Sequence, residues 1–260
     1  MAAKKPLPRI LTVKSAWHLT PNMIRVTFSG DGLEGLPEGR ASANCKLMLP
    51  EPGESRPAFL RRLEEGPAPV RRTYTVRHHR PDAGELDIDF VDHGDAGPAS
   101  AWARQAAAGA FLGFAGPGPV KVKEFVADYY VLAADMSAIP VVAATLEAMP
   151  ADARGLALFE ITAPEDRQDL VAPPGIDLRW YIHATPSVTS SRMIDEIRAM
   201  PWPDGRVQTC IAGEHEAIRA IRDFLLTEKR LPREDTYISG YWKIGLVEEE
   251  HQDLKRTEAA

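Results

Sequence analysis

The sequence predicts two domains: an N-terminal antiparallel β-barrel, and a C-terminal α/β domain with a mostly parallel sheet. Two observations carry this prediction. Short strands broken by Pro and Gly fill the first part of the chain. Further along, strands with continuous apolar runs alternate with helices, as in a parallel sheet covered on both faces. We place the boundary near residue 124, which gives domains of residues 1–124 and 125–260.

The N-terminal region begins with a predicted hairpin. The segments "ILTVKSAWHL" and "MIRVTFSG" flank the turn residues Thr20-Pro21-Asn22. A third short strand is expected at "CKLMLP". Residues 51–70 are rich in Pro, Gly, Glu and Arg, so we expect a long loop there.

Two further strands and a helix complete the predicted barrel. The strands are "TYTVR" and "ELDIDFVDH", separated by a turn at 81–84. In the second strand apolar and acidic residues alternate, so Leu86, Ile88 and Phe90 should face one way, and Asp87 and Asp89 the other. The segment "GPASAWARQAAAGA" then changes to a helical period, with one apolar face formed by Ala99, Trp102, Ala103 and Ala106.

The second half alternates between strands and helices. The predicted strands are "DYYVLAAD", "GLALFEI", "LRWYIH", "VQTCIAG" and "TYISGYW". The predicted helices are "IPVVAATLEAM", "SSRMIDEIRAM" and "EHEAIRAIRDFLLTEK". The polar tail "EEEHQDLKRTEAA" is expected to lie on the surface or to fray.

Composition narrows the class of protein. A formal net charge of −6 argues against affinity of the whole protein for nucleic acid or an anionic membrane. Cys45 and Cys210 lie in apolar strand patterns and have no metal-ligand spacing, so we expect inert core thiols in a reducing compartment. The seven His are scattered, and no apolar run approaches membrane-spanning length. We therefore expect a cytoplasmic globular protein without a protein-bound metal.

The segment "RRTYTVR" combines cations, an aromatic ring and a hydroxyl on one strand. Period 2 places Arg72 and Tyr74 on one face. Arg can pair with a pyrophosphate in a fork geometry, and Tyr offers a flat ring for stacking. Thr75 adds a hydroxyl and a backbone N–H near the reactive edge of such a ligand. The competing interpretation is an exposed strand with solvated arginines.

The segment "HGDAGPAS" ends a strand and opens a helix. Gly97 permits a close backbone approach to a ligand. The N–H groups that follow Pro98, together with the Ser100 hydroxyl, suit a phosphate at a helix N-terminus. Taken alone, the segment is more typical of an ordinary Gly-Pro helix start.

These motifs resemble those of the siderophore-interacting proteins, FAD-dependent ferric-siderophore reductases that are related in fold to the ferredoxin–NADP reductase superfamily. The similar segments occur in family order along nearly the whole chain: "RRTYTVR", "DIDFVDHGDAGPASAWA", "GPGP", "YYVLAADMSAIPVVAATLEAMP", "AGEHEAIRAIRDFL" and "SGYWKIG". The most specific are "DFVDHG…GPASAWA" and the late "GYWK".

The resemblance implies FAD in the barrel and NADH or NADPH on the second domain. The FAD contacts it implies are Arg72, Tyr74, Thr75, Val76, Asp89, Val91 and His93, with Gly97, Pro98, Ala99 and Ser100 at the phosphates. The dinucleotide and cover positions that we expect are Ser137, Gly213, Glu214 and Trp242. A plain helix start at 213–214 is an equally good interpretation. Tyr74, Thr75 and Ser137 are the candidate catalytic residues.

The implied substrate is an anionic ferric siderophore docked near the exposed flavin edge. Candidate basic contacts are Lys46, Lys121, Lys123 and Lys243, which under the simpler interpretation are solvated surface lysines. We expect Lys121 and Lys123 to share one strand face, so that at most one of them points to substrate. Binding through lysines predicts weaker substrate affinity as salt rises.

The chain departs from the family pattern at three places. It has Ala134-Asp135-Met136-Ser137 where many members have Gly-Asp-Glu-Thr, "GPGP" for "GPGG", and Lys243 in place of Arg. Dinucleotide binding is therefore the weaker inference, and a reduced ferredoxin remains an alternative donor. Two other functions stay open: a flavin-dependent reductase with a protein or quinone acceptor, and a non-enzymatic siderophore-binding protein. A monomer is expected.

Overall fold

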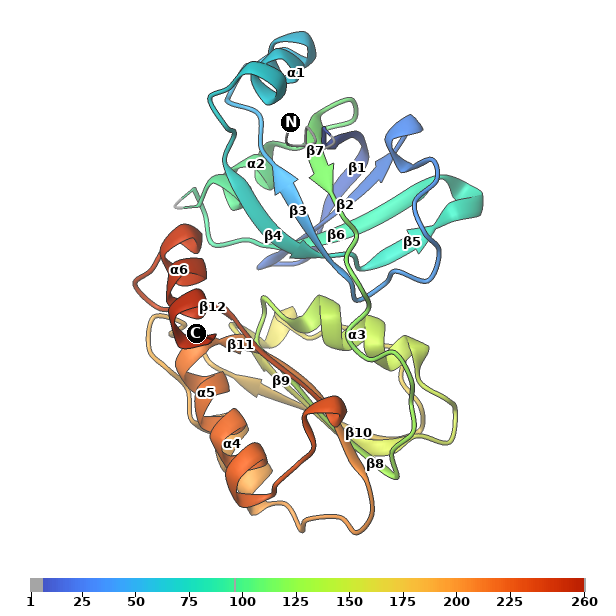
Figure 1. Cartoon of the computed structure of the whole chain (residues 1–260), viewed down its shortest axis with the longest axis vertical. Helices are drawn as coiled ribbons and strands as arrows, with labels where there is room; N and C mark the ends of the chain where they lie inside the picture. Colours follow the sequence, from blue (N-terminus) through green and yellow to red (C-terminus); the bar gives the residue numbers. More distant parts are fainter. Residues whose placement is uncertain (1–6, 96, 260) are drawn as a thin grey trace, which may run out of the picture. The chain divides into compact units, whose positions relative to one another are not determined.

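The computed structural model describes residues 7–95 and 97–259. The chain divides into two compact units, Met1–Val120 and Lys121–Ala260 (Figure 1). The predicted boundary near residue 124 lies four residues further along the chain. Within the described ranges, no helix combines the length and apolar character needed to cross a membrane.

The first unit is an antiparallel sheet with two helices. Its seven strands lie in the order β4-β3-β7-β1-β2-β6-β5. Their bounds are β1 Arg9–Thr20, β2 Met23–Ser29, β3 Asn44–Met48, β4 Arg71–Thr75, β5 His78–Arg80, β6 Glu85–Val91 and β7 Phe111–Ala115. The helices are α1 Arg56–Glu65 and α2 Pro98–Gln105. The predicted hairpin is confirmed, because β1 and β2 pair antiparallel on either side of the Pro21-Asn22 turn.

One extended segment joins the two ends of this sheet. Strands β4 and β5 occupy opposite ends of the strand order, yet only Val76 and Arg77 separate them along the chain. The Val76 N–H donates to the Ala43 carbonyl at 2.8 Å, and the Arg77 N–H donates to the Asp87 carbonyl at 2.9 Å. The segment therefore bonds to both edges of the sheet, as closure into a barrel requires.

The alternation predicted for β6 is confirmed. Leu86, Ile88 and Phe90 are fully buried in the core of the first unit, and α2 packs on it through its apolar face, as expected. Each such side chain contributes about 1.5–3 kcal/mol through burial. The Trp102 ring lies 5.8 Å from the Phe90 ring, centroid to centroid, which fixes α2 against the barrel.

The opposite face of β6 carries an ordered charge cluster. Asp87 accepts hydrogen bonds from Thr27 at 2.7 Å, His78 at 2.9 Å and Arg80 at 2.7 Å. Burial alone would raise the pKa of Asp87, but the hydrogen bonds from His78 and Arg80 outweigh it and hold the pKa below its ordinary value. The ionised carboxylate thus links β2, β5 and β6.

Replacing Asp87 with Ala should therefore destabilise the first unit by about 2–3 kcal/mol at neutral pH. This is below the cost of breaking a fully buried pair, because the Arg80 side chain is 39% exposed. A carboxyl group whose pKa is lower in the folded than in the unfolded state stabilises the protein at pH values above its unfolded-state pKa. This stabilisation is lost as pH falls through the folded-state pKa. The difference from wild type in urea unfolding should consequently shrink in strong acid. Asp82→Ala in the adjacent turn is the control, with an expected change below about 0.5 kcal/mol. Equal effects of the two substitutions would contradict this account.

The loop predicted for residues 51–70 is wrong, because Arg56–Glu65 forms helix α1. The Ser55 hydroxyl accepts a backbone N–H of the first turn at 3.4 Å, which is the geometry of an N-cap. Phe59 is fully buried and anchors the helix. The Pro and Gly residues around this segment predicted a loop, although Ser55 caps the helix and Phe59 anchors it.

The second unit is a fully parallel sheet with helices on its faces (Figure 1). The strand order is β10-β9-β8-β11-β12. The strand bounds are β8 Tyr129–Ala134, β9 Arg154–Ile161, β10 Gly175–Ile182, β11 Val207–Glu214 and β12 Thr236–Trp242. The helices are α3 Ile139–Ala148, α4 Arg192–Ala199, α5 His215–Asp223 and α6 Glu248–Ala259. The predicted fold class is therefore confirmed in both halves. The strand order reverses between β8 and β11, and ligands of open α/β sheets bind at such switch points.

The C-terminal tail differs from the prediction of a polar surface or frayed segment. It forms helix α6, and His251 within it is buried. Acidic residues fill its first turn and Arg256 its last, which suits the helix dipole at both ends. The final residue of the tail lies outside the described residues.

Both cysteines are buried, as predicted. Burial raises the pKa of Cys45 to about 12 and that of Cys210 to about 12. A thiol in this state is a poor nucleophile at neutral pH.

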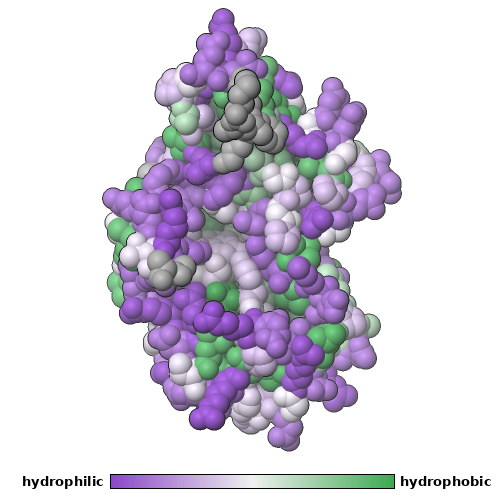
Figure 2. All heavy atoms as spheres, viewed as in Figure 1, coloured by the Kyte–Doolittle hydropathy of each residue, from purple (hydrophilic) through white to green (hydrophobic). Residues whose placement is uncertain are grey.

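Hydrophilic side chains cover most of the face shown in Figure 2, with apolar residues in smaller areas between them.

Candidate flavin and nucleotide sites

Arg72 and Tyr74 lie on one face of β4, as predicted. Tyr74 pairs with Cys45 of β3, and Arg72 pairs with Leu47. Because Cys45 and Leu47 are buried in the barrel core, this face of β4 is the one turned toward the core. Both Arg72 and Tyr74 stay half-buried rather than fully enclosed.

The Tyr74 ring is held from one side. It packs on Phe90 with 4.5 Å between ring centroids and 41° between planes. This contact restricts the ring, and its remaining exposure is what a stacking ligand requires. A preformed aromatic platform loses little entropy when a planar ring system binds.

Thr73 and Thr75 alternate with Arg72 and Tyr74 along β4, so their side chains lie on the other face of the strand. Thr75 and Val76 are both buried, and the Val76 backbone is already bonded within the barrel, its N–H to the Ala43 carbonyl at 2.8 Å and its carbonyl to the Ser42 N–H at 2.9 Å. On this outer face Lys46 donates a hydrogen bond to the Thr73 hydroxyl. Lys46 is thus positioned beside the candidate flavin strand, in the same unit.

The start of α2 fits a phosphate group. Gly97 is the N-cap residue and Pro98 the first helical residue, and no side chain of the described residues caps this start. The first N–H groups of a helix have no partner within the helix, so they are available to an anion. A Cβ atom at Gly97 would lie 2.4 Å from Cε1 of His93, so the Gly97 backbone and the exposed His93 ring lie close together. Ala99, which follows Pro98, is buried against the barrel.

Ser100 has a different role from the one expected. Its hydroxyl donates to the Gly94 carbonyl at 2.8 Å and accepts from the His93 N–H at 3.2 Å. The side chain is buried, and these bonds shape the loop that precedes α2. A phosphate would therefore meet backbone N–H groups rather than this hydroxyl.

Asp89 is also occupied within the barrel. Its two carboxylate oxygens accept hydrogen bonds from Arg25 at 2.7 and 2.8 Å, in a bidentate pair across β2 and β6. Its contribution to a ligand would consequently be through the backbone. Further along, Val91 is half-buried and His93 is exposed.

The first unit therefore offers a cation, a restrained aromatic ring and an uncapped helix start. This donor set matches the parts of FAD, which carries a pyrophosphate and a planar ring system.

In the second unit, Asp135 organises the ends of three strands. One carboxylate oxygen accepts from the Ser137 N–H at 2.9 Å and the Ser137 hydroxyl at 2.6 Å. The other accepts from the indole N–H of Trp242 at 2.7 Å. Burial raises the pKa of this carboxyl group above its ordinary value. Sequence reasoning named Ser137 and Trp242 but missed Asp135, although its place directly after β8 at the switch point was a usable signal.

Gly213 and Glu214 complete this strand edge. A Cβ atom at Gly213 would lie 2.9 Å from Cγ of Asp135, so glycine makes room for that carboxylate. The Glu214 carboxylate accepts from the N–H groups of Glu216 at 2.9 Å and Ala217 at 3.1 Å. Glu214 is thus the N-cap of α5, which agrees with the simpler of the two sequence interpretations.

The four candidate lysines do not share one environment. Lys243 pairs with Glu216. The ammonium group of Lys121 lies 5.3 Å from the Tyr237 ring centroid, and burial lowers its pKa. Lys123 is exposed. The strand expected for Lys121 and Lys123 is wrong, because this stretch is irregular and precedes β8, so the two do not share a strand face.

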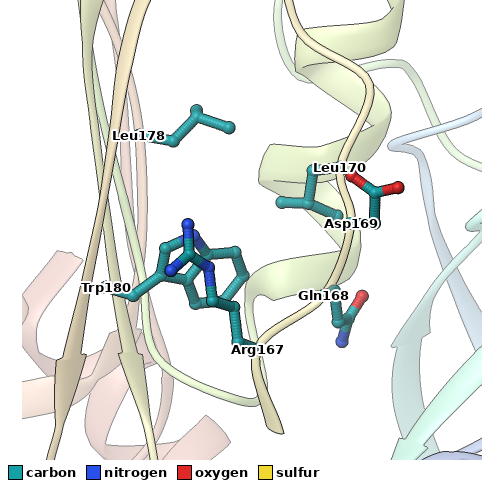
Figure 3. Close-up of a pocket in the computed structure, with 6 residues that line it drawn as sticks. All are labelled: Arg167, Gln168, Asp169, Leu170, Leu178 and Trp180. Carbon is teal, nitrogen blue, oxygen red and sulfur yellow. The ribbon is translucent and has the colours of Figure 1, made fainter. Parts of the chain in front are cut away.

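A surface cavity lies beside the edge strand β10 (Figure 3). It is lined by Arg167, Gln168, Asp169, Leu170, Leu178 and Trp180, none of which is a predicted site residue. Trp180 stacks on Phe159 with 4.4 Å between centroids, so it mainly packs the sheet. Across the described residues, no group of three or more His, Cys, Asp or Glu is arranged to hold a metal ion.

Both units of the chain are similar to known proteins. A family model described as "Siderophore-interacting FAD-binding domain" matches residues 12–121, and one described as "Siderophore-interacting protein" matches residues 127–245. The ferric vibriobactin reductase ViuB of Vibrio cholerae is 33% identical over 95% of this chain and 93% of its own.

Solved structures agree. The siderophore-interacting protein SipS of Aeromonas hydrophila is 31% identical, with a TM-score of 0.85 over 97% of this chain and 98% of its own. The ferredoxin reductase of carbazole 1,9a-dioxygenase is 15% identical, with a TM-score of 0.66 over 92% of this chain and 71% of its own, and shares the fold. The chain therefore belongs to the siderophore-interacting protein family.

Proposed function

We infer that this protein is a ferric-siderophore reductase that uses FAD and a nicotinamide dinucleotide, NADH or NADPH, and releases Fe(II) in the cytoplasm. Family membership over nearly the whole chain supports the activity. In the structure, the proposal rests on one observation. The same unit contains Arg72 and Tyr74 on one face of β4 and the uncapped start of α2.

The chain's own residues have separate tasks in this proposal. Arg72 and the first N–H groups of α2 hold the FAD pyrophosphate, and Tyr74 supports the ring system. Asp135 orients Trp242 and Ser137 at the proposed dinucleotide site. FAD, when bound, takes two electrons from a dinucleotide as hydride and passes them singly to Fe(III).

Reduction explains how the metal leaves its chelator. A siderophore binds Fe(III) through hard anionic oxygens, and Fe(II) has a lower charge and weaker affinity for them. The protein need not coordinate the iron itself. It needs to hold an anionic chelate beside the flavin, for which Lys46 on the neighbouring strand is the best-placed lysine of the first unit.

One observation favours a second donor. Because the Glu214 carboxylate occupies the first N–H groups of α5, this helix start is closed to a dinucleotide pyrophosphate. A small reduced protein such as a ferredoxin would need no such site. The dinucleotide remains the first proposal, because Ser137 and Trp242 meet at the switch-point edge of the same unit.

Iron release tests the proposal directly. FAD-loaded protein, dinucleotide and a ferric siderophore are mixed without oxygen, and Fe(II) is trapped by a coloured chelator. Fe(II) should form only when all components are present. Reduction of a quinone but not of the siderophore would support the electron-transfer alternative. Siderophore binding without FAD would support the binding-protein alternative.

Lys46→Gln should raise the Michaelis constant for the ferric siderophore about three- to fivefold at low ionic strength. The loss of one partly solvated ion pair, worth roughly 1 kcal/mol, sets this magnitude. The difference should vanish at high salt, where exposed charges are screened. Lys14→Gln, which removes an exposed lysine of the same unit that is not a candidate contact, should change the constant less than about twofold. A Lys46 effect that does not depend on salt would contradict the charge argument.

A further inference from the structure

The C-terminal helix α6 is held through a buried histidine pair. The His251 side chain of α6 is 1% exposed, and neither of its ring nitrogens makes a hydrogen bond with any residue in the described part of the chain. Its ring meets that of His215 edge-on, with 5.5 Å between centroids. A buried imidazole without partners is stable only in its neutral form.

His215 is itself enclosed between a strand and the helix. It is the first residue of α5, and it lies over Gly240 of β12, where a Cβ atom would be 3.1 Å from its Nδ1. On the other side, its Nε2 contacts the Glu258 carboxylate of α6 at 3.2 Å. Lys255 of α6 adds a hydrogen bond to the Gly240 carbonyl at 3.0 Å. The helix is therefore fastened to β12 and to the start of α5.

We propose that His215 and His251 form a pH-sensitive clasp, which keeps α6 docked at neutral pH and releases it in mild acid. Protonation of His251 would place a positive charge in a buried site. The charged or titratable groups that face it are Lys255 and Glu248 on α6, His215 on α5 and Lys243 after β12. Three of these carry or can acquire positive charge, so the surroundings oppose protonation rather than assist it.

The direction of the pH effect follows from burial. Burial lowers the pKa of His251 below its ordinary 6.5, so the undocked helix takes up a proton more readily than the docked one. Docking is therefore complete above pH 6.5 and weakens as pH falls through that value toward the lowered pKa.

Release of α6 would matter at the proposed dinucleotide site. The helix bonds to β12, which also carries Trp242. The clasp itself does not depend on the proposed function, because it is defined by contacts within the second unit.

Hydrogen exchange of the α6 amides tests the clasp. Exchange is measured on the full chain at about pH 7.5 and about pH 5.5 and corrected for intrinsic rates, with β8 amides as the internal reference. Protection of α6 should fall by up to about tenfold at the lower pH, since each unit of pKa difference is tenfold. In His251→Phe the fall should disappear. The matched control His18→Phe, which changes an exposed histidine of the first unit, should keep it.

A second measurement follows the histidine itself. NMR titration of the wild-type imidazole rings needs no core substitution, and it should show His251 titrating below 6.5, in step with the α6 amides. Protection that does not change with pH, a fall that persists in His251→Phe, or a His251 midpoint at or above 6.5 would overturn the clasp.

Discussion

Replacing Arg72 with Ala should weaken FAD binding by about 10- to 100-fold while the first unit stays folded. The expected loss corresponds to about 1.5–3 kcal/mol, the contribution of hydrogen bonds to a charged group. Arg72 is half-buried at the end of β4, where its guanidinium also donates to the Arg71 carbonyl at 2.9 Å. Its side chain is only half-buried, and substitutions at such positions usually change stability by about 0.5 kcal/mol or less, so folding should not suffer.

The neighbouring residue is a matched control. Arg71→Ala removes the same charge from the same strand, but at an exposed position on the opposite face of β4. It should change FAD affinity less than about twofold. Titration of apo-protein with FAD, followed by quenching of flavin fluorescence, measures both constants. Equal losses in the two variants would mean that net charge, and not a specific Arg72 contact, holds the cofactor.

Asp135→Ala should slow reduction of the bound flavin by a dinucleotide about tenfold without lowering FAD content. The substitution removes the acceptor of the Trp242 indole N–H and of both Ser137 donors, each worth about 1 kcal/mol. Trp242 and Ser137 would then lose their fixed orientation, and misplacement of positioning groups by a small distance is costly to rate. Stopped-flow absorbance under excess dinucleotide measures the step.

A conservative variant distinguishes positioning from folding. In Asp135→Asn the amide oxygen can still accept from Trp242, so the rate should stay within about threefold of wild type. The thermal unfolding midpoints of both variants show whether the second unit is intact. If Asp135→Ala reduces at the wild-type rate, or if Asn is as slow as Ala at an equal midpoint, the positioning role fails.

Much of the fold could be predicted because period and burial agree along most elements. In β6 the alternation of Leu86, Ile88 and Phe90 with acidic residues is fully realised in the barrel core. The continuous apolar run of β8, and the alternation of strands with helices, correctly indicated a parallel sheet. These signals are local, so they can be read without knowing the partners of each strand.

Elements whose signals depend on long-range contacts could not be predicted. Strand β7 carries Gly113 at its centre, which weakens any strand pattern, yet a Cβ atom there would lie 3.1 Å from Cβ of Met48. Glycine avoids that tight contact, a reason visible only once β3 and β7 are paired. Helix α6 was missed in a similar way, because its buried anchor, His251, is a polar residue in a polar segment.

In the candidate sites, too, features that follow from local sequence signals could be predicted, and features that depend on the built structure could not. The face shared by Arg72 and Tyr74 follows from strand period alone. The roles of Ser100 and Glu214 do not, since their hydrogen bonds are made within a loop and a helix start that had to be built first. The role of Asp135 in orienting Trp242 could not be read from the sequence, because Trp242 lies 107 residues further along the chain.

The most direct test of the proposed activity is the visible absorption spectrum of the purified protein, followed without oxygen during successive additions. The flavin bands should bleach when NADH or NADPH is added and should recover when ferric siderophore follows. Recovery should coincide with about two trapped Fe(II) per FAD, because each hydride delivers two electrons and each Fe(III) accepts one. A protein that remains colourless after FAD is supplied, or bleached flavin that the ferric siderophore fails to reoxidise, would contradict the account.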